Sequence, residues 1–162
     1  MRLNAPDKII IHHTADSDNR PQFDKINRAH KERTFPLSSL GYYVGYHYLI
    51  ERDGNITQAR KNSDEGAHAV GQNISSIGIG LSGNFDVEWP TVQQKTALTA
   101  LCTKLFEDLN IPLSEIYNHK DFGDTSCPGK YLDKNTVKWL IVGQEINFIN
   151  KFKTWLKTFI KI

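Results

Sequence analysis

Two short runs of β-branched and small residues constrain the fold of this chain more than any other feature of its sequence. Lys8 to His12 reads K-I-I-I-H, and Ser76 to Leu81 reads S-I-G-I-G-L. Neither run alternates between apolar and polar residues, which is typical of strands buried on both faces in a parallel sheet. The sequence therefore predicts a central sheet that is covered by helices.

The first half of the chain predicts a helix and a hairpin between these two strands. Asp18 to Pro21 offers an N-cap and a proline for the first turn of a helix that runs to about Arg33. Val44 to Ile50 is expected to be a strand. The Asp-Gly turn of Arg52 to Asn55 then leads into a second short strand through Ile56.

The second half predicts one long helix and a last strand. Thr91 is placed to cap the helix, with Gln94 at the capping-box position. Glu115 to Asn118 is expected to be a strand that ends next to His119. The order of strand, helix, hairpin, strand, helix and strand predicts an α/β fold: a single domain with a central mixed β-sheet flanked by helices.

Length and charge narrow the classes of function. A chain of 162 residues is long enough to bury a core without a metal, so a metal here is expected to be functional. The net charge of +2 gives no argument for nucleic acid as a partner. Cys102 lies among leucines on the long helix, and we expect a core thiol in a protein made in a reducing compartment.

The N-terminus does not resemble a signal peptide. Residues 1–8 lack a charged stretch followed by an apolar one, and no apolar run reaches the ~18 residues that span a bilayer. We therefore expect synthesis in the cytoplasm, with any target outside the cell reached only after release.

A metal-ligand pattern begins within the last predicted strand and continues beyond it. Tyr117 to Lys130 reads Y-N-H-K-D-F-G-D-T-S-C-P-G-K, with Cys127 eight positions after His119. A third ligand is expected from the His12 and His13 pair, of which only one can face a given site because successive strand residues point to opposite faces. A single histidine or cysteine is more often satisfied in a core than bound to metal.

Two imidazoles and one thiolate leave the fourth position of zinc open, which is the arrangement of catalytic zinc. Zinc lowers the pKa of a bound water toward ~7 and polarises carbonyl groups. The pattern therefore favours hydrolysis of an amide or ester.

Four sequence blocks resemble a known family. They are I-I-I-H-H-T-A, V-G-Y-H-Y-L-I-E-R-D-G, G-A-H-A-V-G-Q-N with S-I-G-I-G-L-S-G-N-F, and N-H-K-D-F with T-S-C-P-G. Together they resemble the zinc-dependent N-acetylmuramoyl-L-alanine amidases, which include phage-lysozyme-type amidases and peptidoglycan recognition proteins. The resemblance covers roughly residues 8–135 and implies the fold of that family.

The resemblance implies a role for each candidate residue of the reaction centre. It makes His12, His119 and Cys127 the zinc ligands and leaves His13 as a packing residue. Tyr46 matches the active-site tyrosine that hydrogen-bonds the attacking water or the oxyanion. Thr125 occupies a position where some members carry lysine, and it is expected to stabilise the tetrahedral intermediate as a neutral donor.

Two further positions are implied to bind substrate. His68, in the G-A-H-A loop, resembles a residue of the substrate cleft, and Arg60 matches another recurrent position. The alternatives are that His68 only orders its loop and that Arg60 is solvated. Asp121 either orients a ligand imidazole or caps its loop.

The implied function is zinc-dependent hydrolysis of the amide bond between N-acetylmuramic acid and L-alanine in peptidoglycan, in an enzyme of the phage endolysin type. A peptidoglycan-binding recognition module without turnover is one alternative. An amidase acting on soluble wall fragments is another, and the metal chemistry alone also allows a different amide substrate.

The tail is expected to be a separate element. Residues 1–143 are expected to form the catalytic domain, and residues 144–162 an amphipathic helix with a cationic face. The helix is expected to pack on the domain, and the alternative is contact with a membrane surface. We expect a monomer. The apolar face of the tail comprises Ile146, Ile149, Phe152, Trp155, Leu156, Phe159 and Ile160.

Overall fold

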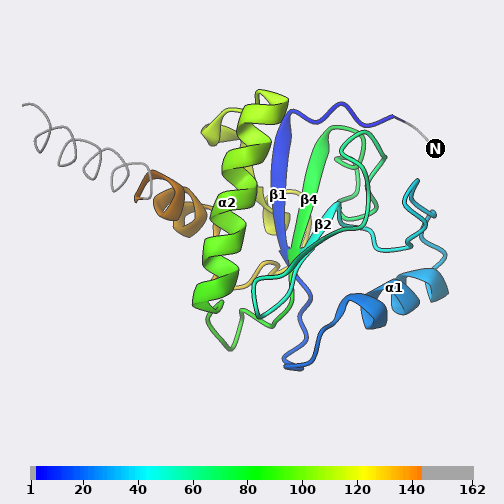
Figure 1. Ribbon diagram of the computed structural model, residues 1–162, viewed down its shortest axis with the longest axis horizontal. Coiled ribbons are helices and arrows are strands. Elements are labelled where there is room, and N and C mark those ends of the chain that lie inside the picture. Colours follow the sequence, from blue (N-terminus) through cyan, green and yellow to red (C-terminus); the bar gives the residue numbers. More distant parts are fainter. Residues whose placement is uncertain (1–2, 144–162) are drawn as a thin grey trace, which may run out of the picture.

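A computed structural model of the chain describes residues 3–143 (Figure 1). Its elements follow the order that the sequence predicts, with two short 3-10 helices near the end and a further helical segment at residues 134–143. The bounds are β1 Lys8–His13, α1 Phe23–Glu32, β2 Tyr48–Ile50, β3 Ile56–Gln58, β4 Ser76–Leu81, α2 Val92–Leu109, η1 Leu113–Glu115, β5 Ile116–Asn118 and η2 His119–Asp121.

The strands form one mixed sheet in the order β3-β2-β4-β1-β5. Strand β1 lies between β4 and β5 and runs parallel to both, and the central strand β4 also runs parallel to β2. Only β3 is antiparallel, because it is the second arm of the hairpin with β2. The predicted α/β fold with a mixed sheet is confirmed.

The two faces of the sheet pack against different residues. Odd-numbered residues of β1 and β4, such as Ile9 and Ile77, pack in the main core with one side of α2. Figure 1 shows α2 alongside the sheet and α1 apart from it, beyond the lower ends of the strands. Even-numbered residues point to the opposite face, where Ile10 is paired with Gly78 and His12 with Gly80.

Helix α2 has the features that its sequence predicts. The Thr91 side chain accepts a hydrogen bond from the Gln94 backbone, and the Gln94 side chain accepts one from the Thr91 backbone. The predicted core thiol Cys102 is fully buried in the cluster with Leu98 and Leu105, and burial raises its pKa to about 12.

Helix α1 begins later than the predicted N-cap and first turn at Asp18 to Pro21. The helix begins at Phe23, and its N-cap residue Gln22 makes no side-chain capping bond. The carboxylate of Glu51 instead accepts hydrogen bonds from the backbone N–H groups of Gln22 and Phe23, at 2.9 Å each. A remote acid thus caps the helix, and the local sequence of Asp18 to Pro21 does not.

The predicted strand at Val44 to Ile50 is also too long, since β2 begins only at Tyr48. The backbone of Gly45 has other partners. Its N–H donates to Nδ1 of His30 at 3.0 Å, and its carbonyl accepts from the N–H of Ala67. These bonds replace a strand ladder and hold the segment before β2 against α1 and the following loop.

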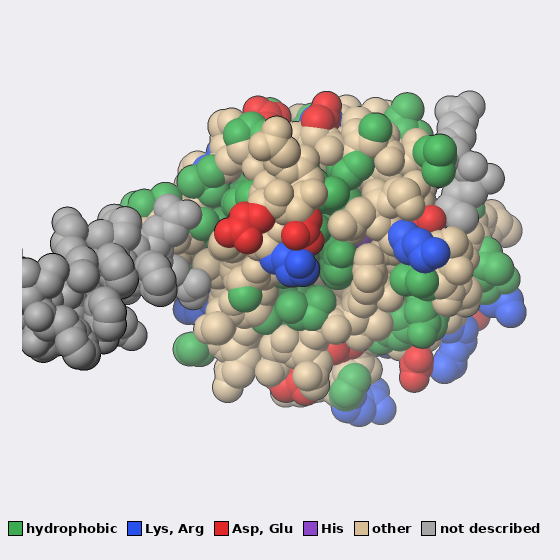
Figure 2. Space-filling view, turned by 45° about the horizontal axis from the view of Figure 1, so that its top comes forward, with side chains coloured by type: hydrophobic (Ala, Val, Ile, Leu, Met, Phe, Trp, Pro, Cys, Tyr) green, Lys and Arg blue, Asp and Glu red, His purple; other side chains and the backbone are tan. Residues whose placement is uncertain are grey.

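The described chain ends in the helical segment 134–143, where Val137 and Ile141 are buried in the core with α2. The predicted amphipathic helix 144–162 lies outside the described residues. Among residues 3–143, no helix combines the length and apolar character needed to cross a membrane. On the face shown in Figure 2, acidic and basic side chains occur in small, mixed groups.

Candidate metal and active site

Three potential metal ligands meet at the carboxyl ends of β1 and β5. His12 is the penultimate residue of β1, His119 follows β5 directly, and Cys127 lies on the loop beyond η2. One ligand atom from each residue lies within 4.8 Å of the others, and the rings of His12 and His119 have centroids 4.5 Å apart. The parallel pairing of β1 with β5 is what brings the two histidines together.

The loop that carries Cys127 is fixed from several sides. The N–H of Lys120 donates to the carbonyl of Cys127 at 2.9 Å, which closes the segment between two of the candidate ligands. The Cys127 N–H donates to Oγ1 of Thr125 at 3.2 Å, and the N–H of His13 points to Sγ at 3.4 Å. The thiol is buried as a result.

The three side chains fit a zinc ion. Zinc bonds of 2.0–2.1 Å to nitrogen and 2.3 Å to sulfur, at a tetrahedral angle, place the two atoms about 3.6 Å apart. His12 Nδ1 and Cys127 Sγ are 3.7 Å apart. Burial, with smaller effects of His119 and His13, lowers the pKa of His12 well below its usual value, so this imidazole is neutral and can act as a ligand.

The thiol would have to lose its proton on binding a metal. Burial raises the pKa of Cys127 to about 11, against a smaller opposing effect of the His13 N–H. Thiolate is the form that binds zinc, so loading the site at neutral pH is expected to release a proton. Burial also lowers the pKa of His119, which keeps it neutral.

Two neighbours of the ligands have structural partners. His13 faces away, and its Nδ1 accepts a hydrogen bond from the N–H of Phe85 at 3.1 Å. Asp121 accepts from the N–H of Asn118 at 2.8 Å and pairs with Lys134. Of the two roles open for Asp121, the structure supports the cap of its own loop.

Tyr46 lies beside the candidate metal site. Its ring centroid is 5.1 Å from that of His12, and the ring rests on Gly80, where an added Cβ would be 2.6 Å from it. Burial, with a smaller effect of the Cys127 charge, raises the pKa of Tyr46 above its usual range. The phenol therefore stays protonated at neutral pH and can donate a hydrogen bond.

His68 lies against His12 on the other side. Its Nδ1 is 3.0 Å from His12 Nε2, and its Nε2 is 3.4 Å from Oγ of Ser76. Burial and the neighbouring His12 lower its pKa well below the usual value. The sequence did not indicate that Ser76 contacts His68. The glycines at alternate positions of β4 do mark where the rings of His68 and Tyr46 approach the strand.

Arg60 is fully buried, and its guanidinium is occupied within the fold. Its nitrogens donate to the carbonyls of Val44, Glu65 and Pro36 at 2.6–3.0 Å. The alternative of a solvated Arg60 is wrong. The predicted contact of Arg60 with substrate stays a prediction, and the observed bonds hold the loop before β2 to the loop after β3.

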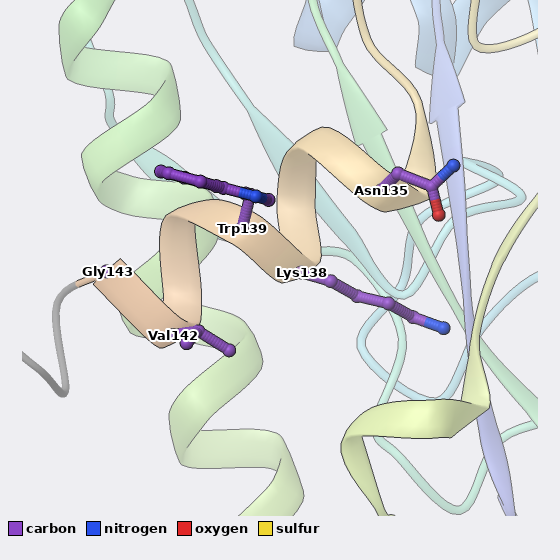
Figure 3. Close-up of a pocket in the computed structure, with 5 residues that line it drawn as sticks. All are labelled: Asn135, Lys138, Trp139, Val142 and Gly143. Atoms are coloured by element: carbon purple, nitrogen blue, oxygen red, sulfur yellow. The ribbon is translucent and has the colours of Figure 1, made fainter.

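A separate apolar hollow lies on the helical segment 134–143 (Figure 3). It has a volume of about 300 Å³, and none of the candidate site residues lines it. Trp139, which borders it, is 82% exposed. The described residues that line the hollow include none of the histidine, cysteine or carboxylate side chains that the candidate site offers. Its lining residues are Asn135, Lys138, Trp139, Val142 and Gly143.

The fold and the three converging side chains define an α/β domain with one potential metal site at the edge of its sheet. Comparison with known proteins agrees with this class. Residues 2–130 match the family model described as N-acetylmuramoyl-L-alanine amidase. The chain belongs to this family.

Relatives and solved structures come from both branches of the family. Peptidoglycan-recognition protein SC2 of Drosophila melanogaster is 33% identical over 132 residues, covering 80% of this chain and 72% of that protein. The endolysin of Enterobacteria phage K11 is 31% identical over 106 residues, covering 62% and 66%. The structure of the N-acetylmuramoyl-L-alanine amidase LysC from Clostridium intestinale URNW superposes with a TM-score of 0.72 at 37% identity, covering 85% and 88%.

Proposed function

We propose that this protein hydrolyses the amide bond between N-acetylmuramic acid and L-alanine in peptidoglycan, and that it requires zinc. The observation that carries the proposal is the convergence of His12, His119 and Cys127 within 4.8 Å at the carboxyl edge of the sheet. Membership of the amidase family supports this substrate, and the similarity to LysC and to the phage K11 endolysin supports a lytic enzyme of the endolysin type.

His12, His119 and Cys127 would hold the ion and leave one position open. Zinc in such a site supplies a Lewis acid for the carbonyl and lowers the pKa of water at the open position. The β1–β5 pairing fixes the spacing of the two histidines. Cys127 lies on a loop that is held next to them by the hydrogen bonds of its carbonyl to Lys120 and of its sulfur to the His13 N–H.

We propose that the hydroxyl groups of Tyr46 and Thr125 serve the reacting carbonyl. Tyr46 keeps its proton at neutral pH and can donate a hydrogen bond to the oxygen that gains negative charge. The Thr125 oxygen accepts the N–H of Cys127, and its own proton stays free to donate. Cleavage then gives the muramic carboxylate and the amino group of L-alanine.

The test uses purified peptidoglycan and measures new N-terminal L-alanine together with the zinc content of the protein. Cys127→Ala is expected to lose both zinc and release of L-alanine. Cys102→Ala makes the same chemical change at a buried thiol of the core, and it is the matched control that should keep both.

The similarity to peptidoglycan-recognition protein SC2 makes binding without turnover the second outcome to be measured. A zinc-loaded wild type that binds the wall but releases no L-alanine from any wall type would contradict the amidase proposal. Release of L-alanine by Cys127→Ala at the wild-type rate would contradict the role of the site.

A further inference from the structure

We infer that His68 is a positioning residue that holds His12 in the tautomer protonated at Nε2, which leaves Nδ1 as the atom that binds the metal. The inference rests on the proposed zinc site and changes the role expected for His68, from a substrate contact to a support of a ligand. It assigns a direction to each hydrogen bond behind His12.

The direction follows from a carbonyl at the end of a hydrogen-bonded chain. The hydroxyl of Ser76 is 2.7 Å from the carbonyl oxygen of Gln72, which can only accept, so the single hydroxyl proton of Ser76 points there. Ser76 can then only accept from Nε2 of His68, at 3.4 Å. His68 therefore carries its proton on Nε2.

The neutral imidazole of His68 consequently has an unprotonated Nδ1. This atom is 3.0 Å from Nε2 of His12, so the contact requires a proton on His12 Nε2. The other nitrogen of His12, Nδ1, is then unprotonated. It is also the nitrogen that lies 3.7 Å from Sγ of Cys127, on the side where the ligands converge.

The surrounding residues enclose the His68 ring and leave it little freedom to move. His68 is 8% exposed, and both of its ring nitrogens have partners, so neither is left for a substrate. An added Cβ at Gly78 or Gly66 would come within 2.5–2.6 Å of the ring. Metal-binding histidines commonly donate their second N–H to a fixed acceptor, and here the acceptor is a second imidazole.

The direct test is the tautomer of His12, measured by long-range proton–nitrogen correlation on protein labelled with ¹⁵N-histidine. We expect a proton on His12 Nε2 in the metal-free protein, and the same proton with Nδ1 bound to metal after addition of zinc. A proton on Nδ1 in the metal-free protein, or zinc bound through Nε2, would overturn the inference. So would a wild type that binds no zinc.

Variants of His68 test whether the acceptor matters for the metal. His68→Leu removes it, and zinc affinity measured against a competing chelator is expected to fall about ten- to hundredfold. His68→Asn places an amide oxygen near the position of Nδ1 and is expected to recover most of that loss. Equal affinity in the leucine variant and the wild type would contradict the inference.

His30→Leu is the matched control. It also removes a half-buried histidine next to Tyr46, but His30 accepts from the Gly45 N–H and contacts no candidate ligand through hydrogen bonds. Its zinc affinity should equal that of the wild type. Unfolding of the metal-free variants shows whether each still folds, and the tautomer of the wild type decides the matter if a variant does not.

These readouts separate the inference from the proposed function. Zinc bound through His12 Nδ1, in a protein that releases no L-alanine, would remove the amidase proposal and keep the role of His68. Release of L-alanine by a protein whose zinc is bound through His12 Nε2 would do the reverse.

Discussion

Tyr46 is the residue whose removal tests the proposed reaction most narrowly. It lies beside His12 but supplies none of the three candidate ligand atoms. Tyr46→Phe keeps the ring on Gly80 and removes only the hydroxyl. We expect the rate of L-alanine release to fall about 10²-fold, the usual effect of losing one donor to an oxyanion, with zinc content unchanged. An unchanged rate would assign the oxyanion to another donor.

His47 gives the molecule a pH-dependent stability. It is fully buried, its Nδ1 accepts from the N–H of Gly78 at 3.0 Å, and its Nε2 lies 3.0 Å from the carbonyl of Asp64. Burial is the main reason that its pKa is lowered to about 4. A proton on Nδ1 would face the Gly78 N–H, so the folded state holds the neutral form.

The unfolded chain binds a proton at this position below about pH 6.5, whereas the folded chain does so only below about pH 4. The stabilisation is therefore complete above pH 6.5 and declines as pH falls toward 4, by up to about 1.4 kcal/mol per pH unit. We predict that metal-free His47→Asn shows a shallower slope of unfolding free energy over this window. Equal slopes in urea titrations of the two proteins would contradict it.

At the level of single residues, sequence reasoning reached the ligands but not their supports. Spacing and the resemblance led to His119, Cys127 and His12, and the structure brings these three together. The Ser76 hydroxyl and the buried bonds of Arg60 were not foreseen, because periodicity reports which face a residue occupies and not which atom it bonds.

Strand β4 leaves room for the Tyr46 ring because it carries glycine at position 80. An added Cβ at Gly80 would lie 2.6 Å from the Tyr46 ring, and the strand is too buried to move away. We predict that Gly80→Ala costs about 1–3 kcal/mol of stability, as overpacking does, and also slows L-alanine release.

Gly143→Ala, in the helical segment 134–143, is the control for the added methyl group, because an added Cβ there meets nothing within 4 Å. Chemical unfolding and the L-alanine assay, applied to both variants, give the comparison. Gly80→Ala with wild-type stability and rate would mean that Tyr46 can move without consequence.

The elements also show where local sequence is insufficient. Strands β1 and β4 and the cap of α2 follow from runs and motifs within a few residues, and these predictions are confirmed. The start of α1 depends on Glu51 and the short β2 depends on His30, both distant in the chain. A window of neighbouring residues contains neither partner.

For the whole molecule, the metal is expected to add stability without being required for the fold. The core between the sheet and α2 contains none of the three candidate ligands. Removal of zinc by a chelator should leave the far-ultraviolet circular dichroism unchanged and abolish L-alanine release. Zinc at a hundred times its dissociation constant should add about 2.7 kcal/mol to stability. Unfolding on chelation would show a structural metal instead.

The division of the chain is a second prediction at this scale. Residues 1–143 include the candidate site and the buried Val137 and Ile141. We expect the fragment 1–143 to release L-alanine from purified peptidoglycan at the rate of the full chain, because no candidate site residue lies beyond it. A folded fragment that binds zinc but has lost activity would show that residues 144–162 belong to the catalytic unit.

The pairing of β1 with β5 also sets the order in which the protein can be assembled. Ile11 pairs with Asn118, so β1 meets its neighbour β5 only after most of the chain is available. Contacts of such long sequence separation form slowly, and during synthesis they wait for the later segment to leave the ribosome. His12 is synthesised early, whereas His119 and Cys127 are synthesised near the end of the chain. The candidate metal site is therefore completed late in folding.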